Sequence, residues 1–155
     1  MGDIELRDDT TNAKAKIYSG GALKDDGAVA PSTFGSTTTG DATELVVGST
    51  AAAAANNQTL AAAAGKRTYI AGFYVDGLGA TGASVITITV TGLGVTLTFK
   101  LSIPAGTGTQ LANRLLVTFP RPIPASADNT AIVVNVPSFG AGNTESDAGA
   151  WGFQI

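Results

Sequence analysis

The chain has 155 residues and a net charge of −3, with 14% charged residues and neither cysteine nor histidine. Without cysteine it can form no disulfide framework, thiolate nucleophile or Cys-ligated zinc site, and without histidine it lacks the commonest general base and metal ligand. The net negative charge also argues against nucleic-acid binding, which needs clustered Lys and Arg. We therefore expect a protein that is not an enzyme and does not bind nucleic acid.

The first 43 residues differ from the rest of the chain in charge and composition. Residues 1–44 carry a net charge of −4 and residues 45–155 a net charge of +1. Two short extended pieces are predicted at residues 4–7 and 15–18, separated by a turn at residues 8–12. Residues 30–40 are rich in Pro, Ser, Thr and Gly and are typical of a linker. Residues 1–43 are therefore predicted to form an extended N-terminal arm that orders against something else.

Residues 44–155 are predicted to form one β-sandwich domain. Strands are expected near residues 44–47 and 58–63, while residues 51–64 are so rich in alanine that helical propensity competes with the strand prediction there. Asn56 and Asn57 interrupt that segment and it has no amphipathic stripe. The strand is therefore the favoured alternative, and a helix is the other.

The later strands are predicted from alternation of apolar and polar residues. The predicted inward sets are Tyr69, Ala71, Phe73 and Val75; Ile86, Ile88 and Val90; Val95, Leu97, Phe99, Leu101 and Ile103; Leu115, Val117 and Phe119; Ile132, Val134 and Val136; and Trp151, Phe153 and Ile155. About eight short strands without a credible helix predict an all-β fold. We expect an antiparallel β-sandwich, with a jelly roll as its eight-stranded form.

Several patterns could carry chemistry, but each has a simpler interpretation. The pairs Asp8-Asp9 and Asp25-Asp26 lack the spacing of an EF-hand and are interpreted as solvated turn residues. The glycine-rich residues 77–82 are not followed by Gly-Lys-Ser/Thr, so they are interpreted as a connection. A glycosidase needs two carboxylates that face each other across a cleft, whereas the four acidic residues after Glu44 are placed in predicted loops: Asp76, Asp128, Glu145 and Asp147. We expect no catalytic residue, metal or cofactor.

Two surface features could bind a sugar. Threonine rows at residues 85–91 and 95–101 could form a flat polar face, although outward threonine is ordinary in a half-buried strand. Tyr18, Tyr74 and Trp151 could stack on a sugar ring. Trp151 alternates with Phe153 and Ile155, however, so it is predicted to lie in the core.

The start of the chain and its longest apolar run bear on location. Residues 1–9 are charged, and no apolar segment follows them, so we expect no signal peptide and synthesis in the cytoplasm. The longest unbroken apolar run, residues 51–55, is far shorter than the ~20 residues of a membrane span. We expect no membrane partner.

Three passages of the chain together carry a family resemblance. The first, at the N-terminus, consists of residues 4–8 (IELRD), 13–17 (AKAKI) and 21–23 (GAL). The second is a strand-turn-strand opening at residues 57–72 (NQTLAAAAGKRTYIAG), and the third is a closing pattern at residues 117–123 (VTFPRPI), 129–136 (NTAIVVNV) and 149–153 (GAWGF). Together these passages resemble small β-sandwich virion proteins of tailed bacteriophages, and none of the motifs is catalytic.

The resemblance implies a non-enzymatic structural protein of the virion. We expect a capsid decoration or cement protein that binds and stabilises the outer surface of a phage head, with the major capsid protein and copies of itself, as a homotrimer, as partners. The candidate capsid-anchoring residues of the arm are Ile4, Leu6, Arg7, Lys14, Lys16, Ile17 and Tyr18. The alternative is a tail or fibre-tip module that recognises a host-surface glycan.

Overall fold

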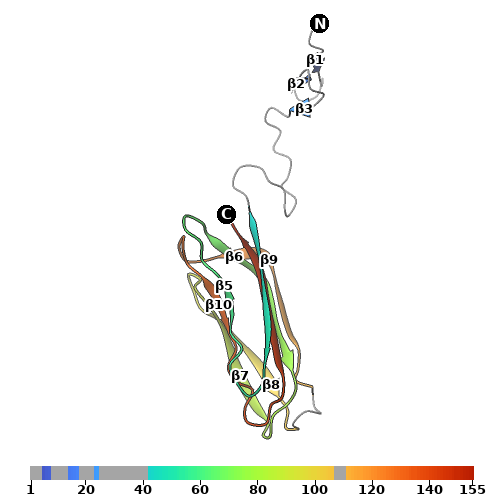
Figure 1. Ribbon diagram of the computed structural model, residues 1–155, viewed down its shortest axis with the longest axis vertical. Coiled ribbons are helices and arrows are strands. Elements are labelled where there is room, and N and C mark those ends of the chain that lie inside the picture. The colour runs from blue at the N-terminus through green and yellow to red at the C-terminus, as the bar shows by residue number, and fades with distance from the viewer. Residues whose placement is uncertain (1–4, 8–13, 18–22, 25–41, 107–110) are drawn as a thin grey trace. The chain divides into compact units, whose positions relative to one another are not determined.

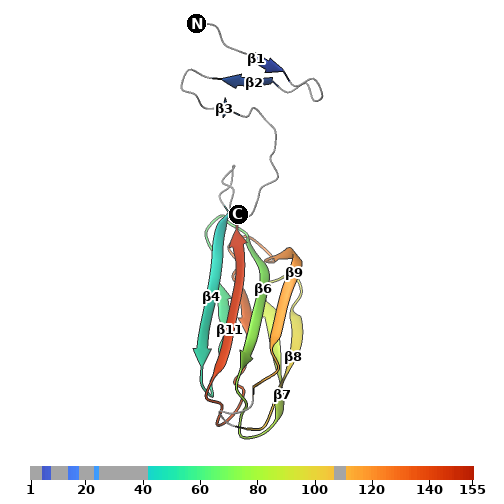
Figure 2. The same cartoon turned by 90° about the vertical axis from the view of Figure 1, so that its right-hand side faces the viewer.

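The structure is a computed structural model that describes residues 5–7, 14–17, 23–24, 42–106 and 111–155. The chain divides into two compact units, residues 1–36 and residues 37–155, and each unit is described by itself. Figures 1 and 2 label their strands. The boundary predicted from composition, between residues 43 and 44, falls at the start of the first strand of the second unit.

The N-terminal unit holds three short strands. They are β1 (Glu5–Arg7), β2 (Lys14–Ile17) and β3 (Leu23–Lys24), in the antiparallel order β1-β2-β3. The first two coincide within a residue with the predicted extended pieces, whereas β3 was not expected from the sequence. Two candidate anchoring residues, Ile4 and Tyr18, lie outside the described residues.

The second unit is all-β, and the described residues contain no helix. Its eight strands are β4 (Thr43–Ala51), β5 (Gln58–Leu60), β6 (Thr68–Gly77), β7 (Ser84–Thr91), β8 (Leu97–Ile103), β9 (Leu115–Pro124), β10 (Ile132–Asn135) and β11 (Ser146–Gln154). They form two four-stranded antiparallel sheets, in the orders β4-β11-β6-β9 and β5-β10-β7-β8. Figure 2 faces the first sheet, with β7 and β8 of the second sheet behind it. The predicted antiparallel β-sandwich is therefore confirmed.

The chain passes between the two sheets at every connection from β4 to β11 except the β7–β8 hairpin. A long antiparallel hairpin folded over on itself produces this order, because its two arms then contribute alternately to both sheets. The jelly roll expected from the sequence stays a prediction.

Apolar side chains from alternating positions of both sheets fill the interior. Ile86, Ile88 and Val90 of β7 are buried, as are Ile132, Val134 and Val136 in and after β10. Phe73 of β6 crosses to the opposite sheet, where its ring meets Phe99 edge to face at 5.1 Å between centroids. These inward sets agree with the alternation in the sequence. Val95 is the exception in the predicted set of residues 95–103, because it lies before β8 (Leu97–Ile103) and is 73% exposed. Leu115, Val117 and Phe119 of β9 also pack against this core, as predicted.

The predicted inward set of β6 is partly wrong. A register shift between Ile70 and Gly72 marks a bulge in the pairing with β9. Ile70 and Phe73 are both buried, whereas Tyr69 and Ala71 are only half-buried. A bulge inserts one extra residue and thereby exchanges the faces of the strand on either side of it, so strict alternation fails across it.

The predicted inward set at the end of the chain is also wrong. Ala148, Ala150 and Gln154 of β11 are buried, whereas Trp151 and Phe153 are half-buried and Ile155, after the strand, is 48% exposed. β11 lies between β4 and β6, and small side chains on its inner face leave room for the large residues of the opposite sheet. The aromatic residues of β11 consequently belong to the outer face.

The alanine-rich segment forms no helix. β4 ends at Ala51, β5 covers only Gln58–Leu60, and the residues between them are bends and irregular backbone. The strand predicted near residues 58–63 is therefore present, but it ends at Leu60. Buried Asn56 explains part of the irregular path, because its amide donates to the carbonyl oxygens of Ser49 and Ser146, at 2.8 Å each.

Candidate functional site: the outer face of the β4-β11-β6-β9 sheet

Large apolar and aromatic side chains gather on the outer face of one sheet. Pairing aligns Val46, Trp151, Gly72 and Thr118 in one row across the four strands, and Gly48, Gly149, Tyr74 and Leu116 in the next. We call this surface the aromatic face and define it as Val46, Tyr69, Tyr74, Leu116, Trp151 and Phe153. Val46 is 69% exposed and Leu116 is 62% exposed, so the face is open at both edges of the sheet.

Glycines let two of the aromatic rings lie close to the sheet. A Cβ atom at Gly72 would lie 2.3 Å from Cζ2 of Trp151, and one at Gly149 would lie 2.4 Å from Cε1 of Tyr74. Each ring therefore covers the Cα of a glycine on the neighbouring strand, in space that any other residue would fill. This arrangement fixes both rings against a flat backbone surface.

A group of charged residues borders the aromatic face. Asp147 and Asp76 are paired neighbours on β11 and β6. The hydroxyl of Tyr74 donates to Asp147 Oδ1 at 3.3 Å, and Arg114 Nε lies 3.1 Å from Asp76 Oδ2. Two carboxylates side by side repel each other, and these two contacts offset that repulsion.

The Tyr74 hydroxyl is held in its neutral form by its surroundings. Burial raises the pKa of Tyr74 above its ordinary value, and the negative charge of Asp147 raises this pKa further. The guanidinium carbon of Arg114 lies 5.9 Å over the Tyr74 ring, so this ring already carries a cation. Trp151 has no such cation among the described residues, so it offers the more open ring.

A second aromatic pair lies at the other end of the same face. The rings of Tyr69 and Phe153, which are paired across β6 and β11, stack with 4.9 Å between centroids and 9° between planes. Stacking of this kind on adjacent strands stabilises the sheet. The aromatic residues thus extend along most of the length of β11.

The outer face of the other sheet is polar. We call it the threonine face and define it as Thr87, Thr89, Thr91, Thr98, Lys100 and Asn135. Asn135 Nδ2 donates to Thr89 Oγ1 at 3.2 Å and to Thr91 Oγ1 at 3.1 Å, and Lys100 Nζ donates to Thr87 Oγ1 at 3.3 Å. The threonine rows predicted from the sequence are present, but these hydroxyls bond to neighbouring side chains.

The other residues that the sequence singled out belong to several strands or lie outside the described residues. Of the candidate anchoring residues, Leu6 and Arg7 belong to β1, and Lys14, Lys16 and Ile17 belong to β2. Asp8-Asp9 and Asp25-Asp26 lie outside the described residues. Asp76 and Asp147 lie in strands rather than in the predicted loops, and only these two of the four acidic residues are paired neighbours.

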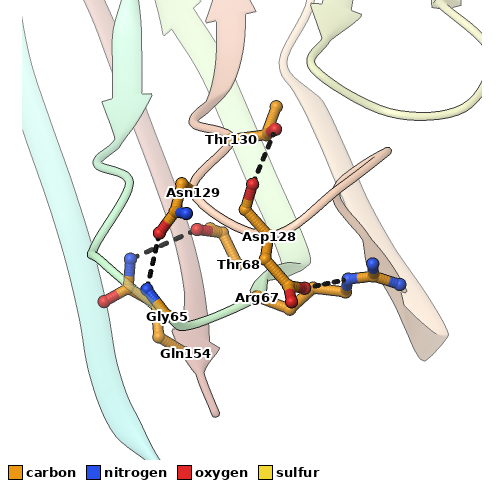
Figure 3. Close-up of polar contacts among 7 residues, drawn as sticks. All are labelled: Gly65, Arg67, Thr68, Asp128, Asn129, Thr130 and Gln154. Carbon is orange, nitrogen blue, oxygen red and sulfur yellow. Dashed lines mark hydrogen bonds and ion pairs between the residues drawn. The ribbon is translucent and has the colours of Figure 1, made fainter.

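The basic residues Lys66 and Arg67 contact other residues of the sandwich. Arg67 Nε lies 2.9 Å from Asp128 Oδ1, and Asn129 Oδ1 accepts a hydrogen bond from the backbone of Gly65 at 2.6 Å (Figure 3). Asn129 has a φ of 57°, in the left-handed region that asparagine tolerates. These contacts join the loops before β6 and β10, so they are structural.

Buried polar side chains of the sandwich bond mainly to backbone. Asn143 Nδ2 donates to the carbonyl oxygens of Leu78 and Glu145 at 2.8 and 2.9 Å. No buried side-chain nitrogen or oxygen lacks a partner among the described residues. The described ranges also contain no group of three acidic residues able to hold a metal ion. No helix in them is long and apolar enough to cross a membrane.

Sequence reasoning missed the aromatic face as a surface. In β11, Gly149, Trp151 and Phe153 share one parity, while Ala148, Ala150 and Gln154 share the other. The alternation in the sequence predicted that the set with the large aromatic side chains, Trp151 and Phe153, points into the core. The available signal was the pairing of aromatic residues with glycines on the neighbouring strand, which needs the register of β6 and β11.

Comparisons with protein-family models, with curated proteins and with solved structures find no match.

Proposed function

We propose that this chain is a non-enzymatic structural protein of a phage virion, a decoration or cement protein that binds the outer surface of the head and stabilises it. The observation that carries the proposal is the division of the chain into a sandwich and a separate small unit of two- to four-residue strands. Strands this short gain little from their own packing and are suited to pairing with another protein. The resemblance of residues 57–153 to phage β-sandwich proteins supports the virion location.

The proposed partners are the major capsid protein and further copies of the chain. Residues 1–43 would anchor the protein, with strand addition to a capsid sheet as the mode of contact, because backbone hydrogen bonds demand little side-chain specificity. The candidate contact residues are Ile4, Leu6, Arg7, Lys14, Lys16, Ile17 and Tyr18. The proposal requires no cofactor, metal, nucleic acid or membrane.

Deletion of residues 2–20 tests the anchor. The deleted protein is expected to keep the unfolding midpoint of the sandwich but to lose binding to particles that lack the native protein, measured by co-sedimentation. A matched control exchanges Gly82 for alanine in the full chain, because nothing lies within 4 Å of the added Cβ. Equal binding of the deleted and full chains would contradict the anchoring role.

The aromatic face favours a second candidate function, glycan recognition by a tail or fibre-tip module. Aromatic rings pack against the C–H faces of sugar rings, and nearby carboxylates accept hydrogen bonds from sugar hydroxyls. Trp151 and the Asp76–Asp147 pair supply both groups on one surface. Tyr74, named from the sequence as a stacking residue, is the weaker platform because Arg114 covers its ring.

A glycan array with the full chain tests this second function. If it is correct, a specific glycan binds, and both Trp151→Ala and Asp147→Asn weaken its binding. Val95→Ala is the control, since Val95 is 73% exposed and does not belong to the aromatic face. Binding that survives both exchanges, or no binding by the native chain, would contradict glycan recognition through this surface.

A further inference from the structure

The four edge strands of the sandwich differ in how they discourage pairing with another chain. Exposed edges attract foreign strands, and proteins prevent this with prolines, charged residues, bulges or very short strands. β9 contains Pro120, Pro122 and Arg121 and faces a bulge. β8 carries the exposed Lys100, and β5 has only three residues. Three of the edges are therefore protected.

β4 has none of these protections except one charged residue near its start. It is nine residues long and pairs with β11 without a register shift from Thr43 to Ala51. Its sequence, TELVVGSTA, has no lysine, arginine or proline, and its only charge is that of Glu44. Among the described residues β4 pairs with β11 alone, so its other backbone edge faces outward, as Figure 2 shows. Lys66 Nζ bonds to Thr43 Oγ1 at 3.0 Å, at the first residue of the strand.

We propose that β4 pairs with β4 of a second copy, in antiparallel orientation about a two-fold axis at Val47. This axis pairs all nine residues, because Val47 is the middle residue of the strand. Two sandwiches would then share one continuous eight-stranded sheet. The inference concerns self-association only and does not depend on the virion location.

The side chains of β4 fit this arrangement. Antiparallel pairing about Val47 puts Glu44 opposite Thr50 of the partner, whereas parallel in-register pairing would put the two glutamates side by side, which is unfavourable. It also puts Val46 opposite Gly48. Val46 is 69% exposed, and the partner's glycine has no side chain to oppose it. The exposed apolar residue of the edge thus meets no opposing side chain when the two strands pair.

This two-fold contact differs from the trimer predicted from the sequence. A strand edge that pairs with itself closes after two copies, since the contact uses the same surface on each. A dimer is therefore the expected assembly of the isolated protein. The aromatic faces of the two copies would continue into each other across the shared sheet, because Val46 belongs to both the edge and that face.

Sedimentation equilibrium of the full chain tests the contact. The native chain is expected to form dimers, and Val46→Lys should raise the dimer Kd by roughly tenfold or more, since lysine is a common blocker of sheet edges. Val95→Lys is the matched control, because Val95 is similarly exposed, at 73%, and lies outside β4. A monomeric or trimeric native chain would overturn the proposal, as would equal effects of the two exchanges.

A cross-link tests the register independently. The chain has no cysteine, so a single Val47→Cys exchange places a thiol on the proposed axis and nowhere else. Residues opposite each other in antiparallel strands lie close enough for a disulfide. Oxidation should give a covalent dimer with Val47→Cys but not with Val117→Cys, a half-buried position on the protected edge strand β9. Equal cross-linking of both variants, or none with Val47→Cys, would contradict pairing about Val47.

Discussion

The two outer faces of the sandwich have the same strand geometry but opposite chemistry. The threonine face carries hydroxyl and amide groups that bond to one another, as Asn135 does with Thr89 and Thr91. On the aromatic face, Trp151 and Tyr74 lie over glycines of neighbouring strands. Both faces point away from the core, so burial in the core does not account for the difference between them.

The comparison identifies which surface is suited to a partner. Polar groups that bond to one another leave little for a ligand to gain, whereas half-buried aromatic residues are the type that dominates binding surfaces. The aromatic face also ends at β4, the unprotected edge. We therefore propose that contacts made by the sandwich itself, as distinct from those of residues 1–43, lie on its β4-β11-β6-β9 side.

The largest effect is expected from filling a glycine site on the aromatic face. Gly72→Val would place its Cβ 2.3 Å from Trp151 Cζ2 and 2.6 Å from the carbonyl oxygen of Val117. Because a backbone atom must move, we expect a loss of about 3 kcal/mol in the free energy of unfolding. Urea denaturation measures it. Gly82→Val, with nothing within 4 Å, should change it by less than about 0.5 kcal/mol. Equal losses would contradict the described packing.

Removing the indole should have the next largest effect. Trp151→Ala exposes Gly72 and removes a half-buried ring, so we expect a loss of about 2 kcal/mol in unfolding free energy. On the threonine face, Thr98→Ala should cost less than about 0.5 kcal/mol, since Thr98 is exposed. Thermal unfolding of both variants measures the difference between the faces. If Trp151→Ala is neutral, the indole does not pack on the sheet.

The threonine face should be sensitive at one position. Asn135→Ala removes the amide that joins Thr89 and Thr91, and we expect a loss of about 1 kcal/mol. The control is Asn113→Ala, an exposed asparagine outside the strands. Urea denaturation measures the free energy of unfolding of both variants. Equal values would contradict a stabilising role for the Asn135 amide contacts.

Tyr74→Phe should give the smallest effect, and it should depend on pH. At neutral pH the exchange removes the bond to Asp147, at a cost of about 0.5 kcal/mol. Folding raises the pKa of Tyr74, so its contribution is fully present below the ordinary value of 10.0 and is lost as pH rises through the raised value. Native protein should therefore lose stability relative to Tyr74→Phe above pH 10. The free energy of unfolding of both proteins is measured from pH 7 to pH 11. A constant difference between them over this range would contradict the raised pKa of Tyr74.

The sequence predicted the parts of the fold that depend on local alternation. The inward residues of β7, β9 and β10 and the approximate places of β1 and β2 follow from period-two patterns and turn residues. Val95 was predicted to point inward but lies before β8 and is exposed, whereas the errors in β6 and β11 have non-local causes. A bulge exchanged the faces of β6, and the inner face of β11 holds alanines because the opposite sheet fills the space. The aromatic face depends on the register of four strands, which no single stretch of sequence contains.

The copy number of the protein in purified particles tests the proposed function most directly. Quantitative mass spectrometry against the major capsid protein measures it. A decoration protein of the head predicts a number comparable to that of the capsid subunit. A few copies per particle would contradict a head decoration role and favour the tail or fibre tip. Complete absence from particles would contradict the virion proposal itself.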